Sequence, residues 1–355
     1  MPAAGGQAPR SRALSWAVGI ALAAALLGLA FRGVDGGKVA TLLHGLGGGA
    51  ALLLVPSAMA LGLETQAWQG AFVIMGARPP FFRLLGVRLG SESVGAALPL
   101  GAMWADAVKP TLLAGRCGVP IPVGVAAIAA RKYLLVLSQA GYLAIGFAIG
   151  QSALRKGFDH AAGAPALAWL ALVASLALFV SAYGMAAMLR GGRALRAIMR
   201  AMALMPVKRV RDRLLGLSAS VSHTDHAASL FFGATARARL PLALRCLAAW
   251  LLEATETCLI LRLLGARVGW SDAVAIEGLV GLLRHVLVVL PGGLGAQELG
   301  YTALLTGLGC GVDTCAAFVL LKRARELFWI AIGCAALSSA SRLPAVTEER
   351  PASAY

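Results

Sequence analysis

Residues 290–309 read LPGGLGAQELGYTALLTGLG and stand between two long apolar runs. The start of this stretch holds a proline, which lacks the backbone N–H, and three glycines, which adopt backbone conformations that other residues avoid: Pro291, Gly292, Gly293 and Gly295. Irregular backbone at membrane depth persists only where protein or a water-filled cavity surrounds it. The stretch therefore predicts a broken, re-entrant helix that lines a polar cavity, with Glu298 about one turn beyond the break.

The rest of the sequence has the composition of a membrane protein. Of its 355 residues, 59% are hydrophobic and only 14% are charged, and the mean hydropathy is +0.78. A soluble domain of this length carries about 25% charged residues. We therefore expect an all-α fold, a polytopic bundle of transmembrane helices that forms one integral membrane domain over residues 1–355.

Several apolar runs have about the 20 residues that a transmembrane helix needs: 13–31, 42–63, 119–150, 165–189, 240–264, 273–290 and 313–337. The first is long for a signal peptide, so we expect a retained helix. Residues 81–98 read as a helix of mixed character, and 98–115 read as a second broken segment. Together these predict roughly eight spans, with the number of crossings before Arg190 left open between four, five and six.

Residues 190–240 are strongly basic. The chain carries 32 Lys and Arg against 16 Asp and Glu, and much of the excess lies in this segment. Arg193, Arg196 and Arg200 recur at helical spacing, which is typical of an amphipathic helix on an anionic leaflet, here over 190–213. The positive-inside rule places this loop in the cytoplasm. Nucleic acid is not an expected partner, because aromatic residues are sparse and no nucleic-acid motif is present.

Signals of catalysis and of metal binding are weak. The six cysteines form no CxxC pair and lie near no histidine cluster. Motifs of the GxSxG, HExxH and P-loop types are absent. We therefore predict no metal, no cofactor and no enzymatic activity.

The two broken segments align without a gap at an offset of 192 residues, the separation of Leu98 from Leu290. The aligned pairs are Leu98/Leu290, Pro99/Pro291, Gly101/Gly293, Asp106/Glu298 and Arg131/Arg323. Transporters are often built from two related halves whose discontinuous helices meet at a central site. The alignment predicts such an internal repeat, in which each half supplies one broken helix, one acid and one intramembrane arginine.

Charged residues inside the apolar runs are the candidate site. An ionisable side chain in the hydrocarbon costs several kcal/mol, so it normally faces the bundle interior or a cavity. Glu277 and Arg284 are seven residues apart and share a helix face, and we expect Arg323 to pair with Glu298. The residues that we assign to a headgroup-binding site are Glu298, Arg323, Arg284, Glu277, Asp106 and Arg131. The arginines would meet an anionic or zwitterionic headgroup, and the acids would meet its cationic part.

Other charges suggest structural roles. Lys322 and Glu326 are four residues apart, and we expect them to pair along one helix. Lys132 and Arg325 are expected to snorkel to an interface. The structural interpretation, ion pairs that hold helices in register, also stays open for the site residues.

The LPGGLGxxE segment, the arginine in the next helix and the earlier LPLGxxxxD segment together resemble the lysylphosphatidylglycerol synthase/flippase transmembrane family. The residues that match the second-half motif are Pro291, Gly292, Gly293, Gly295, Glu298 and Arg323, whereas the first half has Leu100 where Gly292 stands. The resemblance implies a membrane domain that moves a modified phospholipid or a related lipid between leaflets. The best-known members also carry a soluble aminoacyl-transferase domain, but members of similar length to this chain occur alone, some of them associated with hopanoid lipids.

These observations predict a flippase-type protein of the bacterial cytoplasmic membrane, acting on a modified phospholipid or a hopanoid- or polyprenyl-type lipid. No ATPase motif is present, so movement would be passive or driven by a gradient. Two alternatives remain: a membrane-embedded glycosyl- or aminoacyl-lipid transferase, and an accessory subunit of a lipid-biosynthesis complex. Membrane lipids are the expected partners, with lipid-biosynthesis enzymes as further candidates, and the oligomeric state is left open.

Overall fold

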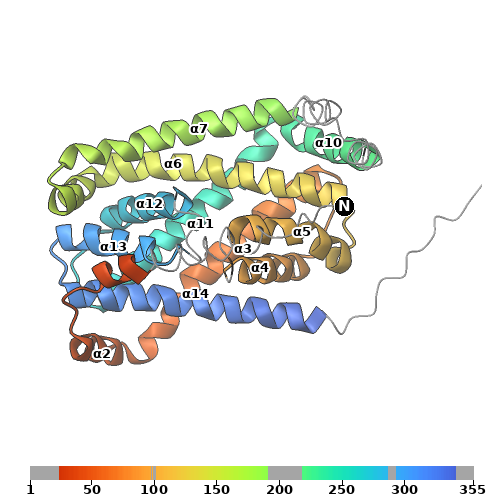
Figure 1. Ribbon diagram of the computed structural model, residues 1–355. Helices are drawn as coiled ribbons and strands as arrows, with labels where there is room; N and C mark the ends of the chain where they lie inside the picture. Colours follow the sequence, from red (N-terminus) through yellow and green to blue (C-terminus); the bar gives the residue numbers. More distant parts are fainter. Residues whose placement is uncertain (1–23, 97, 99–100, 191–217, 287–292, 341–355) are drawn as a thin grey trace, which may run out of the picture.

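The computed structural model describes residues 24–96, 98, 101–190, 218–286 and 293–340, and within these ranges all regular structure is helical. Residues 24–30 are helical, and the elements that follow are α2 (Gly36–Gly45), η1 (Gly47–Leu53), α3 (Leu54–Ile74), α4 (Phe81–Ala96), α5 (Gly101–Cys117), α6 (Ile121–Ala162), η2 (Pro165–Ala168), α7 (Trp169–Arg190), α10 (Ser218–Gly233), α11 (Ala236–Leu263), α12 (Trp270–Val286), α13 (Ala296–Gly307) and α14 (Val312–Ala340). The long helices α6, α7 and α14 extend along a shared direction (Figure 1).

Three of the described helical segments are long and apolar enough to cross a membrane: Gly47–Ile74, Ile121–Ala162 and Pro165–Arg190. On α7, the side chains of Val173, Leu176, Val180 and Tyr183 form one stripe and are 61–78% exposed. A soluble protein rarely exposes such a continuous apolar face, whereas lipid covers it in a bilayer. The prediction of an all-α membrane protein is confirmed. The count of eight spans stays a prediction, because long helices such as α11 and α14 carry charges within their apolar sequence.

The same order of helices occurs twice. In the first half, α3 and α4 are followed by a break, the short helix α5 and the long helix α6. In the second half, α11 and α12 are followed by a break, the short helix α13 and the long helix α14. At the offset of 192 residues, the start of α6 falls within one residue of the start of α14.

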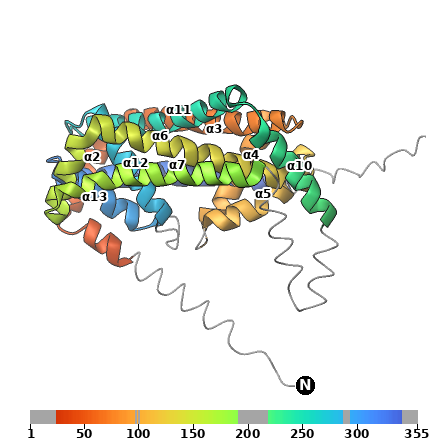
Figure 2. The same cartoon turned by 90° about the horizontal axis from the view of Figure 1, so that it is seen from above.

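The two halves pack against each other in a reciprocal way. Helix α3 contacts α11, α4 contacts α14, and α6 contacts α12, so each long helix lies against the pre-break helix of the other half. Figure 2 shows α3 and α11 together along one side of the bundle. In Figure 1, α6 runs from α5 toward α13, and α14 runs from α13 toward α4 and α5. The related helices therefore run in opposite directions.

Glycines on α6 let the second half approach closely. A Cβ at Gly150 would lie 2.4 Å from the Cβ of Ala275 on α12, and Gly307 on α13 touches the backbone of Gly157. Small residues at such spacing allow membrane helices to pack backbone against backbone. Helix α6 also kinks at Gly150, where the backbone leaves helical geometry. Its prediction as a helix ending near residue 150 was therefore too short, because the chain resumes a helix after the kink and continues to Ala162.

Two other predicted segments need correction. The span predicted at 42–63 is divided by the glycine-rich residues 45–49, and its main helix, α3, continues to Ile74. The segment predicted as broken over 98–115 is a continuous helix from Gly101 onward that includes Pro110, so the break lies only before it. Proline lacks one backbone donor, and a helix tolerates this loss where neighbours compensate.

The predicted basic loop over 190–240 is helical where the structure describes it. Helix α10 packs on α6 and α7, and its Phe231 and Phe232 are fully buried against Tyr133. This part of the segment therefore belongs to the bundle core. Residues 191–217, which hold the arginines of the predicted amphipathic helix, lie outside the described residues.

Candidate functional site

The second-half break positions Glu298 at the start of α13. Gly293 and Gly295 have φ values of 67° and 85°, a left-handed region that favours glycine. Gly295 precedes the helix, and its backbone N–H donates to Glu298 Oε2 at 2.7 Å. The carboxylate thus caps the helix N-terminus, where the helix dipole also favours negative charge. Pro291 and Gly292, assigned to the same motif, lie outside the described residues.

Arg323 on α14 pairs with Glu298, as predicted. Its Nε and Nη2 atoms both lie 2.5 Å from Glu298 Oε1, and its Nη1 atom lies 2.5 Å from Glu326 Oε2. Arg323 Nη2 also donates to the carbonyl oxygen of Gly293 at 3.5 Å. One guanidinium therefore links α14 to both the cap and the backbone of the break.

A second buried network centres on Lys322 and Glu277. Lys322 Nζ lies 2.9 Å from Glu277 Oε1 and 3.8 Å from Glu256 Oε1. Glu277 also accepts hydrogen bonds from Thr257 and, at 2.8 Å, from Tyr301. The side chain of Glu256 is fully buried and that of Glu277 only 5% exposed, so both carboxylates depend on these partners.

Two predicted roles in this region were wrong. Lys322 does not pair with Glu326, because it points toward α11 and α12 while Glu326 binds Arg323. Arg325 does not snorkel, since its side chain is 15% exposed and its Nη1 atom binds Glu256 Oε2 at 2.7 Å. Glu277 lies in this buried network, whereas the side chain of Arg284, its expected neighbour on α12, lies outside the described residues.

A cavity of about 90 Å³ adjoins this network. Residues of α11, α12, α13 and α14 line it, namely Trp250, Glu253, Glu277, Val280, Gly281, Gln297, Tyr301, Lys322, Arg325 and Glu326. Trp250 Nε1 and Gln297 Nε2 are buried donors without a hydrogen-bond partner in the part of the chain that the structure describes. The volume admits several water molecules, and the lining offers them polar partners.

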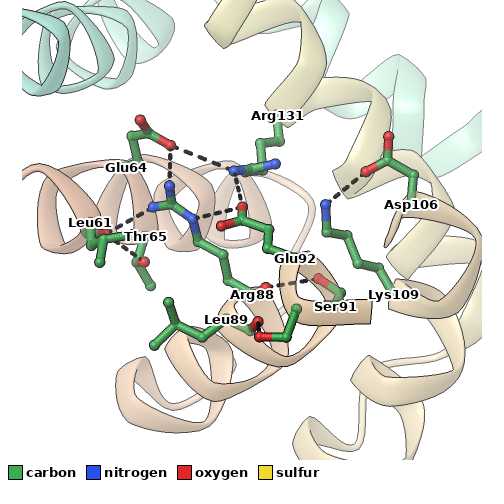
Figure 3. Close-up of polar contacts among 11 residues, drawn as sticks. Leu61, Glu64, Thr65, Arg88, Leu89, Ser91, Glu92, Asp106, Lys109 and Arg131 are labelled. Atoms are coloured by element: carbon green, nitrogen blue, oxygen red, sulfur yellow. Dashed lines mark hydrogen bonds and ion pairs between the residues drawn. The ribbon is translucent and has the colours of Figure 1, made fainter. Parts of the chain in front are cut away.

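The first half holds a separate cluster, shown in Figure 3. Arg88 on α4 binds Glu64 at 2.6 Å, Glu92 at 3.2 Å and the carbonyl oxygen of Leu61 at 3.0 Å. Arg131 on α6 binds Glu92 at 3.0 Å and lies 3.5 Å from Glu64. Its guanidinium also stands over the ring of Trp68. Two arginines thus share two carboxylates between α3, α4 and α6.

Asp106 lies beside this cluster but binds other partners. Its two carboxylate oxygens bind Lys109 and Lys132, each at 2.7 Å. The predicted acid and arginine of the first half, Asp106 and Arg131, therefore belong to different ion pairs, unlike their second-half counterparts. Lys132 is 45% exposed, so it partly reaches outward as expected while still bound to Asp106.

Sequence reasoning missed Glu64, Arg88 and Glu92 as site residues, although one signal points to Glu64. The dipeptide Glu64-Thr65 falls on Glu256-Thr257 at the same offset of 192 residues. Both acids bind arginines in the structure, Arg88 and Arg325 respectively. The repeat thus extends backward to α3 and α11, one of the pairs of helices in contact between the halves.

The two clusters differ in charge. Among the described residues, the first-half cluster holds four cations against three carboxylates: Arg88, Lys109, Arg131 and Lys132 against Glu64, Glu92 and Asp106. The second-half cluster holds three cations against five carboxylates: Lys322, Arg323 and Arg325 against Glu253, Glu256, Glu277, Glu298 and Glu326. Among the described residues, the first cluster therefore holds one cation more than its carboxylates, and the second holds two carboxylates more than its cations.

The chain is similar to known proteins at the level of a family. No curated protein matches the chain. A family model described as "Lysylphosphatidylglycerol synthase TM region" matches residues 16–333, which is nearly the whole chain and includes both charged clusters. The protein therefore belongs to the family of lysylphosphatidylglycerol synthase transmembrane regions.

Proposed function

We propose that this protein moves an amphiphilic lipid between the two leaflets of a bacterial cytoplasmic membrane, without changing it covalently. The observation that carries the proposal is the polar cavity inside a lipid-facing bundle, lined by charged side chains from α11 to α14. Ionisable groups at membrane depth are expensive and normally mark a path for a polar ligand. The headgroup would pass beside these side chains while the acyl chains stay in the bilayer.

The charges of the two clusters support a dipolar headgroup. The excess of carboxylates around the cavity favours a positively charged group, such as an amine. The excess of cations around Arg88 and Arg131 favours a phosphate. A modified phospholipid that bears an amine has both groups, and the hopanoid- and polyprenyl-type lipids are tested beside it.

Entry of a headgroup requires the cavity to widen, because about 90 Å³ holds only a few waters. Helix α13 is the element suited to move, since it is short and follows a glycine-rich break. The Arg323–Glu298 pair ties α13 to α14 beside the cavity. The amine of an approaching headgroup would compete with Arg323 for Glu298 and release this tie. The basic residues 190–213 would hold the cytoplasmic side of the protein on anionic lipid.

The test is a leaflet-resolved assay in liposomes. The purified chain is reconstituted into phosphatidylglycerol/phosphatidylethanolamine vesicles that contain a trace of one acyl-labelled fluorescent lipid. Labelled phosphatidylglycerol, phosphatidylethanolamine and lysyl-phosphatidylglycerol are compared, with a labelled polyprenyl phosphate and a hopanoid as further probes. Dithionite then reduces the outer-leaflet label, and the protected fraction is followed with time.

We expect the protected fraction to fall fastest for the amine-bearing lipids and to stay constant in protein-free vesicles. Glu298→Gln and Arg323→Gln should abolish the movement, whereas Asp159→Asn, an exposed acid near the end of α6, should not. Constant protection for every probe, or full activity of both site variants, would refute the proposal. Mass spectrometry of the recovered lipids distinguishes the transferase alternative, which requires a new lipid species.

A further inference from the structure

Glu253 differs from the other acids around the cavity. It lies on α11 about one turn before Glu256, is partly buried, and borders the cavity. Among the residues that the structure describes, the other four carboxylates of the second-half cluster each have a basic group within 4.0 Å. Glu253 has no ion pair and no hydrogen bond in the same part of the chain.

Among the residues whose side chains the structure describes, the groups that face Glu253 do not supply a free cation. The bases that line the same cavity, Lys322 and Arg325 on α14, already bind Glu277 and Glu256. The other charged and titratable groups around it are acids or phenols: Glu64 on α3, Glu256 on its own helix, Glu277 on α12, Tyr301 on α13, Glu326 on α14 and Tyr142 on α6. A charged Glu253 would therefore add one more negative charge to a region that already has an excess.

Neutral donors surround the same space. Trp250 Nε1, Gln297 Nε2 and Gln139 Nε2 are buried and have no partner among the described residues. Trp250 and Gln297 line the cavity, and Gln139 lies beside Gly281 in its wall. Each of these donors requires an acceptor, and water molecules in the cavity would provide one. Such waters would also connect Glu253 to the Glu277–Lys322 pair.

We propose that Glu253 is a proton-binding site that couples lipid movement to a proton gradient. With the cavity empty, a proton from water on one side of the membrane binds a carboxylate oxygen of Glu253 and neutralises it. When the cationic part of a headgroup enters, the proton leaves through the cavity waters and the carboxylate takes the headgroup charge instead. The proton leaves on the side from which the headgroup entered, and the headgroup is released on the side from which the proton came. One proton therefore crosses for each lipid moved in the opposite direction. The coupling rests on the proposed lipid movement, whereas the proton site stands independently.

The first experiment detects the proton without any lipid substrate. Infrared difference spectra of the purified full chain are recorded between neutral and alkaline pH. We expect the carbonyl stretch of a protonated carboxylic acid at neutral pH in the wild type and in Asp159→Asn. The band should be lost in Glu253→Gln, and it should be retained at a shifted position in Glu253→Asp, which keeps the carboxyl group. A wild-type spectrum without the band, or an unchanged band in Glu253→Gln, overturns the proposal.

The second experiment measures coupling in the vesicles used for the lipid assay. One proton per lipid and a gradient of one pH unit supply the free energy for up to about a tenfold leaflet imbalance of the moved lipid. We expect the wild type and Asp159→Asn to build such an imbalance, and Glu253→Gln to show none. Lipid movement that ignores the gradient in the wild type overturns the coupling while leaving the proposed movement intact. If no probe moves, the proposed movement fails, and the infrared band alone decides the proton site.

Discussion

At the scale of single residues, neighbouring positions on α14 serve different networks. Lys322 faces α11 and α12 and binds Glu277, while Arg323 faces the break and binds Glu298. Successive residues on a helix point about 100° apart, so adjacent charges reach separate partners. Neither network resembles a surface ion pair, because four of the carboxylates and bases concerned are almost wholly buried: Glu256, Glu277, Glu298 and Lys322.

The position of Lys322 predicts a strong and non-additive effect of substitution. Among the described residues, Lys322→Met leaves Glu277 without a base and Glu256 with Arg325 alone, so we expect a loss of about 3–5 kcal/mol in stability. The double variant Lys322→Met/Glu277→Gln should lose less than the sum of the two single variants, because it removes both charges. Thermal unfolding in detergent, followed by size-exclusion chromatography, measures each change.

Lys38→Met is the matched control for this cycle. Lys38 pairs with Asp313 at 3.8 Å, but its side chain is 69% exposed, and exposed pairs contribute only about 0–1 kcal/mol. If Lys322→Met unfolds at the same temperature as Lys38→Met, the network is not buried as described.

At the scale of elements, the breaks and the close helix contacts were predictable to different degrees. The proline and glycines of 290–309 predicted the second break, and Glu298 lies at the helix start as expected. The span predicted over 42–63 ends one residue before Glu64. An acid whose partners are unknown looks like the end of a membrane span. Helix α3 continues past it because Arg88 and Arg131 neutralise it from other helices. Whether a helix continues past a charged residue depends on partners that are distant in the sequence, and a local sequence pattern does not reveal those partners.

The contact between α13 and α6 gives a prediction at this scale. A Cβ at Gly307 would lie 2.6 Å from the Cα of Gly157 and 2.9 Å from the carbonyl oxygen of Lys156. Backbone atoms cannot yield as a flexible side chain can, so Gly307→Ala should lose about 1–3 kcal/mol of stability. The change would appear as a lower unfolding temperature in detergent.

Gly141→Ala tests whether this loss is specific to the contact. Gly141 lies within α6 with no atom within 4 Å of an added Cβ, and alanine favours a helix over glycine by up to about 1 kcal/mol. Its unfolding temperature should stay the same or rise. A fall equal to that of Gly307→Ala would contradict the contact.

At the scale of the whole molecule, the two halves form one packed unit. Each long helix lies against the other half, and α3 lies against α11. The alignment of the two broken segments predicted related halves, and the structure adds their opposite directions and their reciprocal packing. The sequence does not reveal these features, since an offset states which residues correspond and not how they meet.

This packing predicts that neither half is stable alone. If the chain is divided within residues 191–217, each fragment should aggregate or be degraded when expressed singly, because α6 and α14 lose the helices that they pack against. Co-expression of the two fragments should yield a complex that co-purifies through a tag on either one. A monodisperse, cooperatively unfolding single fragment would contradict this.

The ion pairs inside the two charged clusters have a consequence for biosynthesis. Among the described residues, every ion-pair partner in the first-half cluster lies between Glu64 and Lys132. Every such partner in the second-half cluster lies between Glu256 and Glu326. The helices emerge from the ribosome in order, and α4 is made long before α14, against which it packs. Since its charges find partners within its own half, the nascent chain can neutralise them in the lipid while it waits for the rest of the bundle. Insertion can therefore proceed one half at a time, although folding is complete only when α14 arrives.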